Sequence, residues 1–168
     1  VIEEGLCGRT LSLDDPYDED RNGAKMISMV LKTHAPVDVV LIMLGTNDAK
    51  RQFSTNAISI EKGIRTLMYK ALNPEIYRDG SNTPQFFVVC PPKMNIDGLK
   101  NERTKSNFGQ IGFEILNNTK PYLEKGCSGL DVKVIDTHAV AGSLDGIHMD
   151  ESGHKLVADA MISVIKEL

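Results

Sequence analysis

The chain has 168 residues and a mass of 18.5 kDa, the size of one domain, and 41% of its residues are hydrophobic, enough for a substantial core. Its 19 lysine and arginine residues face 23 aspartate and glutamate residues, and the net charge of −4 gives no general attraction to nucleic acid or to an anionic membrane. The three cysteines, Cys7, Cys90 and Cys127, show no C-x-x-C spacing, which argues against a disulfide framework or a zinc site and makes the cytoplasm the expected compartment.

The first part of the chain predicts a strand, a helix and a buried strand. Residues 1 to 3 resemble the end of a short strand, and the glycines of the turn at 5 to 10 permit a close approach of the backbone to a ligand. Apolar residues at helical spacing predict a helix over about 24–31. The unbroken apolar run 39–44 indicates a strand covered on both faces, and the polar residues 46–48 follow it where open α/β sheets usually keep their sites.

The middle of the chain predicts a second helix and a second buried strand. Ser54 or Thr55 is the expected cap of a helix that Asn73-Pro74 ends. Turn residues at 79–84 precede the strand Gln85 to Cys90, which two prolines stop. The polar stretch Lys93 to Lys105 has no periodicity, so we expect a surface loop there, either an ordinary one or one that borders a site.

The last part of the chain completes an alternation of helices and strands. A helix is predicted from Phe108 toward Pro121, a strand at Asp131 to Asp136, and a final helix capped by Asp150. Strands that alternate with helices along the whole length favour an α/β fold with a parallel sheet and helices on both faces. We expect residues 1–168 to form a single domain.

The first candidate for catalysis is Asp145-Gly146-Ile147-His148, between the last strand and the last helix. A turn at Gly146 would bring the Asp145 carboxylate to the His148 imidazole, fix its tautomer and leave the other ring nitrogen free as a general base. Two other interpretations stay open from these residues alone. Either the aspartate and the histidine have no joint role, or Asp145, His148, Asp150 and His154 form a metal cluster.

Three separated motifs together resemble those of the SGNH, or GDSL-type, serine esterases. They are G-L-C-G-R-T at 5 to 10, I-M-L-G-T-N-D at 42 to 48 and D-G-I-H at 145 to 148, in the order and approximate spacing of that family. The flanking V-I-E-E-G-L and R-N-G-A are similar to its arylesterase and acyltransferase branch. The resemblance extends over nearly the whole chain and implies a flavodoxin-like, three-layer α/β/α fold with strand order 2-1-3-4-5.

The resemblance also implies roles for four residues. Gly8 would supply a backbone N–H and Asn47 a side-chain N–H to an oxyanion hole, His148 would be the base, and Asp145 its orienting acid. The chemistry of these groups agrees with the roles. Glycine has no side chain to block a carbonyl oxygen, and an amide is a neutral donor that meets developing negative charge without titrating.

Two charged residues flank these motifs. We expect Asp48, a carboxylate beside a presumed helix start, to fix its turn through backbone N–H groups rather than to take part in the chemistry. Arg9 is expected to pair either with Asp48 or with a substrate, and the sequence does not decide between the two.

The nucleophile of the family is missing from the sequence, because its G-D-S motif belongs before Val1 and no G-D-S occurs. Ser143 and Ser152 are the nearest serines to the D-x-x-H motif, but neither follows a strand directly, and Cys7 is expected to be a small buried thiol. The missing first strand of the family order lies between the first two strands expected here, and its loss would leave unpaired backbone on both. We therefore predict that a segment of strand, serine and helix, separate or omitted, completes the folded domain.

The first functional hypothesis is a serine ester hydrolase that acts on small-molecule esters with short acyl chains, acetyl esters in particular, with hydrolysis or acyl transfer as the outcome. It requires no metal and no organic cofactor, and we expect a homo-oligomer without nucleic acid or membrane partners. A second hypothesis is a catalytically inactive module of the same fold that binds an acylated carbohydrate or a partner protein. A phosphate or flavin binder ranks last, because the turns lack a glycine-rich phosphate-binding pattern.

Overall fold

Three parallel strands form the sheet of the computed structural model, which describes residues 1–77, 80 and 82–168. They are β1 (Val39–Ile42), β2 (Gln85–Val89) and β3 (Val132–Ile135), in the order β1-β2-β3. The register pairs Val40 with Phe86 and Phe86 with Val132. This order corresponds to the last three strands of the predicted 2-1-3-4-5 arrangement. Residues 79 and 81 of the predicted turn at 79–84 lie outside the described residues.

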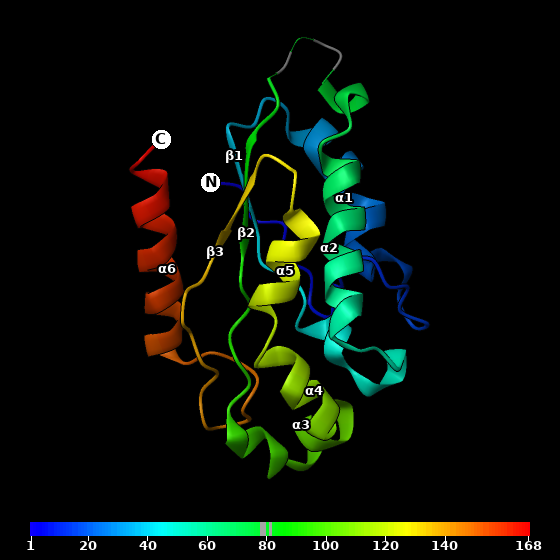
Figure 1. Ribbon diagram of the computed structural model, residues 1–168, viewed down its shortest axis with the longest axis vertical. Coiled ribbons are helices and arrows are strands. Elements are labelled where there is room, and N and C mark those ends of the chain that lie inside the picture. The colour runs from blue at the N-terminus through cyan, green and yellow to red at the C-terminus, as the bar shows by residue number, and fades with distance from the viewer. Residues whose placement is uncertain (78–79, 81) are drawn as a thin grey trace.

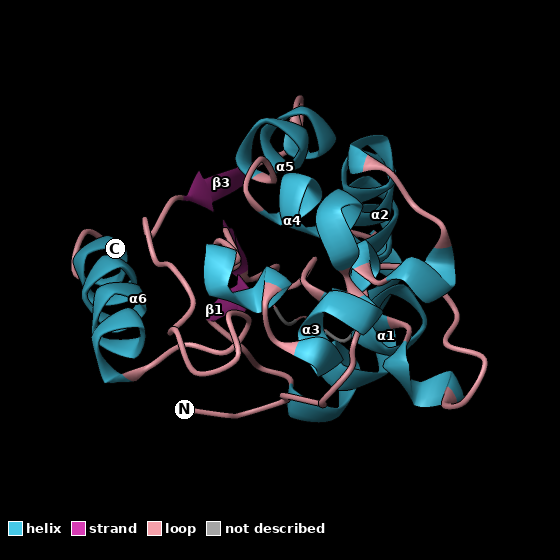
Figure 2. Ribbon diagram, turned by 90° about the horizontal axis from the view of Figure 1, so that it is seen from below, coloured by secondary structure: helices cyan, strands magenta, loops and turns pink. Residues whose placement is uncertain are grey.

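Helices cover both faces of the sheet, as the sequence predicts (Figures 1 and 2). The helices are α1 (Gly23–His34), α2 (Ala57–Ala71), α3 (Glu102–Asn107), α4 (Gly109–Leu116), α5 (Lys120–Cys127) and α6 (Glu151–Ile165). Helix α2 packs between α1 and α5 on one face, whereas α6 lies by itself on the other face. No helix in the described part of the chain is long and apolar enough to cross a membrane. The result is a three-layer α/β/α fold.

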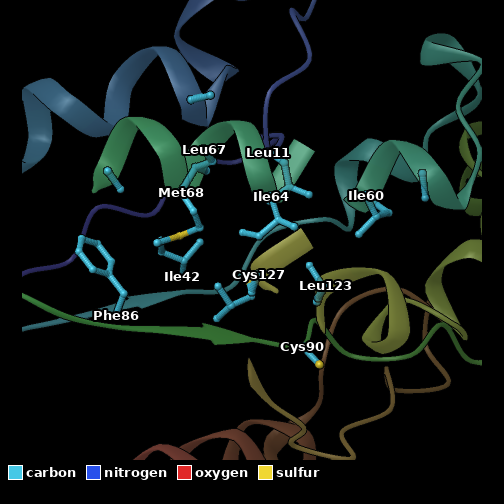
Figure 3. Packing of buried hydrophobic residues seen from close by; sticks show 14 of the residues in the cluster. Leu11, Ile42, Ile60, Ile64, Leu67, Met68, Phe86, Cys90, Leu123 and Cys127 are labelled. Carbon is cyan, nitrogen blue, oxygen red and sulfur yellow. The ribbon is translucent and has the colours of Figure 1, made fainter. Parts of the chain in front are cut away.

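The central strand β2 divides the core into two parts. Successive side chains of a strand point to opposite faces, so Phe86 and Val88 pack in the larger cluster with α1, α2 and α5 (Figure 3). Phe87 and Val89 pack on the other face with apolar residues of α6. All four side chains are buried, which explains why this strand reads as a continuous apolar run.

The strand predicted at residues 1–3 is wrong, since these residues form no strand and are exposed. A strand needs a neighbour for its backbone groups, and in the described chain no other strand lies beside this segment. Strand β1 therefore stands at an edge of the sheet, and its residues Val39, Val40 and Leu41 are only half-buried. On the face that α6 covers alone, Ile162 and Ile165 of this helix stay largely exposed.

Three other predictions need correction. The stretch Lys93 to Lys105 is not an irregular loop, because it contains a 3-10 helix, η5 (Ile96–Leu99), and most of α3. The helix expected from Phe108 toward Pro121 is α4, which ends earlier, at Leu116, and α5, which was not predicted, follows it. Helix α5 has a proline in its first turn, where the missing N–H has no partner to lose. The cap of α2 is Asn56 rather than Ser54 or Thr55. Thr55 instead donates to the backbone oxygen of Asp48 at 2.5 Å.

Candidate active site

Three of the predicted site residues, Asn47, Asp145 and His148, follow strands that end at one edge of the sheet. The strands are parallel, so the segment after β1 and the segment after β3 both leave at the carboxyl edge, the lower end in Figure 1 and the face turned to the viewer in Figure 2. Strand β2 separates them, which puts the ends of β1 and β3 about 10 Å apart. Ligand sites of open α/β sheets usually lie at this edge.

Asp145 and His148 form a close side-chain pair at this edge. Nδ1 of His148 lies 2.6 Å from Oδ2 of Asp145, and because a carboxylate only accepts, the ring nitrogen donates. The other carboxylate oxygen accepts from the backbone N–H groups of Ile147 at 3.0 Å and His148 at 2.9 Å. The His148 side chain is 82% exposed, which leaves its Nε2 open to a reacting group. The predicted turn thus brings the two residues together.

The electrostatics of Asp145 follow from these contacts. Partial burial raises the pKa of its carboxyl group, but the His148 ring and the backbone N–H groups of His148 and Ile147 outweigh that effect and lower the pKa to about 2. Asp145 is therefore a carboxylate throughout the neutral range and keeps a negative charge beside the ring.

The stretch that begins at Lys93, for which the sequence allows either an ordinary loop or one that borders a site, holds this turn in place. The backbone N–H of Asn95 donates to Gly146 O at 3.0 Å, and its side chain donates to Ala141 O at 3.2 Å. Gly146 has a φ of +75°, and a Cβ on it would lie 2.2 Å from the backbone nitrogen of Gly98, so only glycine fits. The polar stretch that begins at Lys93 thus borders the candidate site, although nothing in its sequence pattern identified Asn95.

The other half of the predicted site joins the turn at residues 8–11 to the turn after β1. Gly8 is buried with a φ of +88°, and a Cβ at this position would lie 2.6 Å from Nε of Arg21. Nδ2 of Asn47 donates to the backbone oxygen of Arg9 at 3.0 Å. Because the Asn47 amide carries two N–H groups, one is left for a ligand.

Asp48 binds backbone N–H groups, as predicted, but across to the other turn. It is 1% exposed, and both of its carboxylate oxygens lie 3.0 Å from the backbone nitrogen of Leu11, 37 residues away in the chain. Arg9 does not pair with Asp48, since its Nη1 donates to Glu4 O at 2.6 Å. Asn47 and Asp48 therefore bind Arg9 and Leu11, respectively, and fix the two turns against each other.

Among the described residues, no hydrogen bond joins the remaining candidates to the His148 side chain. Ser143 is exposed, and the hydroxyl group of Ser152 donates to Asp150 at 2.6 Å within the cap of α6. Cys7 is exposed, so the expectation of a buried thiol is wrong for this cysteine. Among the described residues, no group of three or more His, Cys, Asp or Glu side chains is arranged to hold a metal ion. Within that same part of the chain, no hydrogen bond or ion pair joins the pair Asp145 and His148 to Gly8 or Asn47.

The chain is similar to known esterases in sequence and in structure. Residues 17–161 match the family model of the GDSL-like lipases and acylhydrolases. The native M. smegmatis aryl esterase is 30% identical with a TM-score of 0.87, over 99% of this chain and 78% of that one. Est24, a carbohydrate acetylesterase from Sinorhizobium meliloti, is 28% identical with a TM-score of 0.87, over 99% of this chain and 77% of that one.

A curated relative is more distant. The GDSL esterase/lipase WDL1 of Oryza sativa subsp. japonica is 23% identical over 167 residues, which cover 88% of this chain and 61% of that protein. The chain therefore spans less than two thirds of the length of this relative. The family match extends over most of the chain, and the solved structures agree with the observed three-layer fold. The chain belongs to the GDSL-like lipase/acylhydrolase family, the family of the SGNH hydrolases.

Proposed function

We propose that the protein hydrolyses carboxylic esters through a serine, His148 and Asp145. The observation that carries the proposal is the 2.6 Å contact between the His148 ring and Asp145 on an exposed turn at the carboxyl edge of the sheet. A carboxylate on one ring nitrogen selects the tautomer in which the other nitrogen is a base. Family membership supports the proposal, as does the esterase activity named for the similar solved structures.

The proposed reaction has two steps of the same kind. The serine oxygen attacks the ester carbonyl carbon while Nε2 of His148 takes the hydroxyl proton, and Asp145 stabilises the resulting imidazolium. The oxyanion accepts hydrogen bonds from the Gly8 N–H and from the second N–H of the Asn47 amide. The alcohol leaves with the proton from His148, and water then releases the acyl group as a carboxylic acid. A second alcohol in place of water would complete an acyl transfer.

The serine, in this proposal, belongs to a segment of strand and helix that precedes Val1. Two features of the described structure support a place for it. Strand β1 has an unpaired edge with half-buried apolar side chains, and natural proteins avoid leaving such an edge open. Helix α6 covers its face of the sheet alone (Figure 1), and its Ile162 and Ile165 side chains are exposed. A strand beside β1 would end at the same carboxyl edge as Asn47.

For the substrate we propose a small ester with a short acyl chain, and an acetyl ester in particular. Support comes from the similar solved structures, which are named as an aryl esterase and a carbohydrate acetylesterase. We further propose that residues 1–168 belong to one domain, that the protein is a homo-oligomer, and that it works in the cytoplasm. Light scattering of the purified protein and fractionation of cells test the last two.

The test is the turnover of p-nitrophenyl acetate by the full polypeptide and by its His148→Ala variant, together with labelling by a fluorophosphonate. We expect His148→Ala to abolish measurable turnover, and His154→Ala to leave it unchanged. His154 is a matched control, because it is an exposed histidine of α6. Turnover that survives His148→Ala would remove this residue from the proposed role.

The position of the serine is tested separately. We expect the fluorophosphonate to modify a serine outside residues 1–168, so an active, cooperatively folding species of only 18.5 kDa would contradict that assignment. If the full polypeptide shows no turnover but binds an acetylated sugar or a protein partner, the catalytic proposal fails. The inactive binding module would then be the better description.

A further inference from the structure

The two turns that carry Gly8 and Asn47 are joined by adjacent side chains. Asn47 donates to Arg9 O at 3.0 Å, and the next residue, Asp48, accepts from Leu11 N with both oxygens at 3.0 Å. We call these hydrogen bonds the turn-to-turn contact. Arg9 and Leu11 are two residues apart, so the contact fixes both the position and the direction of the backbone that leads out of Gly8.

One side of the turn-to-turn contact is anchored in the hydrophobic core. The Leu11 side chain is 0% exposed and packs among Ile60, Ile64 and Leu67 of α2 (Figure 3). Its backbone nitrogen is therefore held in place, and Asp48 binds a fixed point. Through its carboxylate, Asp48 holds the turn after β1 against this fixed point. Thr55 adds a hydrogen bond to the backbone oxygen of Asp48.

An aspartate at position 48 lowers the stability of the fold. It is 1% exposed, and among the described residues no ion pair involves it. Burial raises the pKa of its carboxyl group to about 7, although hydrogen bonds from Leu11 and from its own backbone N–H oppose the shift. A buried ionised group without a counter-ion destabilises a fold, so its presence calls for a reason other than stability.

We propose that Asp48 is a positioning residue that sets the distance between the two oxyanion donors, the Gly8 N–H and the Asn47 amide. It does not touch the substrate. Its carboxylate accepts with two equivalent oxygens, and an asparagine there would present one oxygen and one N–H₂ donor to the Leu11 N–H. The turns would then shift relative to each other, and a misplacement of about 1 Å costs about 100-fold in rate. The inference rests on the proposed function, because it concerns the same oxyanion hole.

The test compares Asp48→Asn and Asp48→Ala with the wild-type full polypeptide at pH 8. The kcat for p-nitrophenyl acetate is divided by the folded fraction from a urea titration. We expect a loss in kcat of about 10-fold for Asp48→Asn and about 100-fold for Asp48→Ala, with KM changed less than about 3-fold. The asparagine variant rescues part of the loss because it keeps one acceptor. Asp159→Asn, which removes the same charge from the exposed face of α6, should behave as wild type.

A purely structural role for Asp48 gives a different result. Both variants would then lose folded protein, and the kcat per folded molecule would stay within 2-fold of wild type, which would overturn the proposal. Hydrogen exchange of amide groups, followed by NMR, is a measurement that does not depend on catalysis. The Leu11 N–H and the Asn47 side-chain N–H₂ should exchange faster with solvent in Asp48→Ala, and unchanged exchange would also overturn it. If the wild type has no esterase activity, the proposed function fails, whereas the exchange measurement still tests the turn-to-turn contact.

Discussion

The Asp145→Asn variant tests the central pair of the proposed site most directly. Asparagine keeps an oxygen for the N–H groups of Ile147 and His148, which the carboxylate now accepts at 3.0 and 2.9 Å, so the turn should survive. Its N–H₂ then faces Nδ1 of His148 in place of the oxygen at 2.6 Å. The ring responds by accepting at Nδ1 and carrying its proton on Nε2, where the base is needed.

The size of the effect follows from the exposure of the ring. With the His148 side chain 82% exposed, the charge of Asp145 stabilises the imidazolium by at most about 1 kcal/mol, which is about 5-fold in rate. The wrong tautomer and the lost orientation add a larger factor, of the order of 10- to 100-fold. We therefore expect kcat to fall by about 100-fold, less than for the fully buried triad aspartate of a serine protease, where the corresponding change costs about 10⁴-fold.

The assay is the kcat for p-nitrophenyl acetate of the Asp145→Asn, His148→Ala and double variants. Two residues that act as a unit are not additive, so the double variant should be no slower than His148→Ala alone. A loss of less than 3-fold for Asp145→Asn, or a double variant slowed by the product of both single effects, would refute the coupling of Asp145 to His148.

Three further outcomes test other parts of the structure. Gly146→Ala should lower stability and kcat more than Gly129→Ala. Both glycines have a positive φ, but only a Cβ at position 146 would clash with the backbone nitrogen of Gly98. Urea titrations measure the difference in stability, and rate measurements the difference in kcat. The pKa of Asp48 is about 7 in the folded state and 3.8 in the unfolded state, so the stability that its protonation provides is lost as the pH rises through 7. The free energy of unfolding should therefore fall by about 2 to 3 kcal/mol between pH 5 and pH 8, and Asp48→Asn should remove this pH dependence. A thiol reagent should modify one cysteine of the native chain, Cys7, because the other two are buried.

The parts of the fold that sequence patterns predict correctly are those decided by local chemistry. Strand β2 reads as apolar because both of its faces are covered. The cap of α6 is predicted because Asp150 accepts from Gly153 N, three residues on, at 3.0 Å. Such interactions lie within one turn of the chain, so their residues stand next to each other in the sequence.

The predictions that fail depend on partners that the local sequence does not contain. Residues 1–3 have the composition of a strand, but a strand forms only beside another one. Residues 96–107 lack helical periodicity, yet η5 and α3 form there because asparagine side chains cap each of them, Asn95 and Asn101. Short helices of this kind depend on caps and on packing against their neighbours rather than on an apolar stripe.

The two halves of the candidate site also differ in whether their contacts are local or long-range in the sequence. This difference decides how each half responds to substitutions. Asp145 and His148 are three residues apart, so their contact depends on one local turn and on Asn95, which binds that turn. The turns that carry Gly8 and Asn47 are joined by hydrogen bonds between residues 37 and 38 positions apart, which no local pattern encodes. A substitution in the turn at His148 should therefore leave the oxyanion donors in place, whereas a change that loosens Leu11 from the core should move them from a distance. Substitutions of the buried neighbours of Leu11 in α2 should accordingly lower the kcat per folded molecule, in addition to the stability that they cost as core changes.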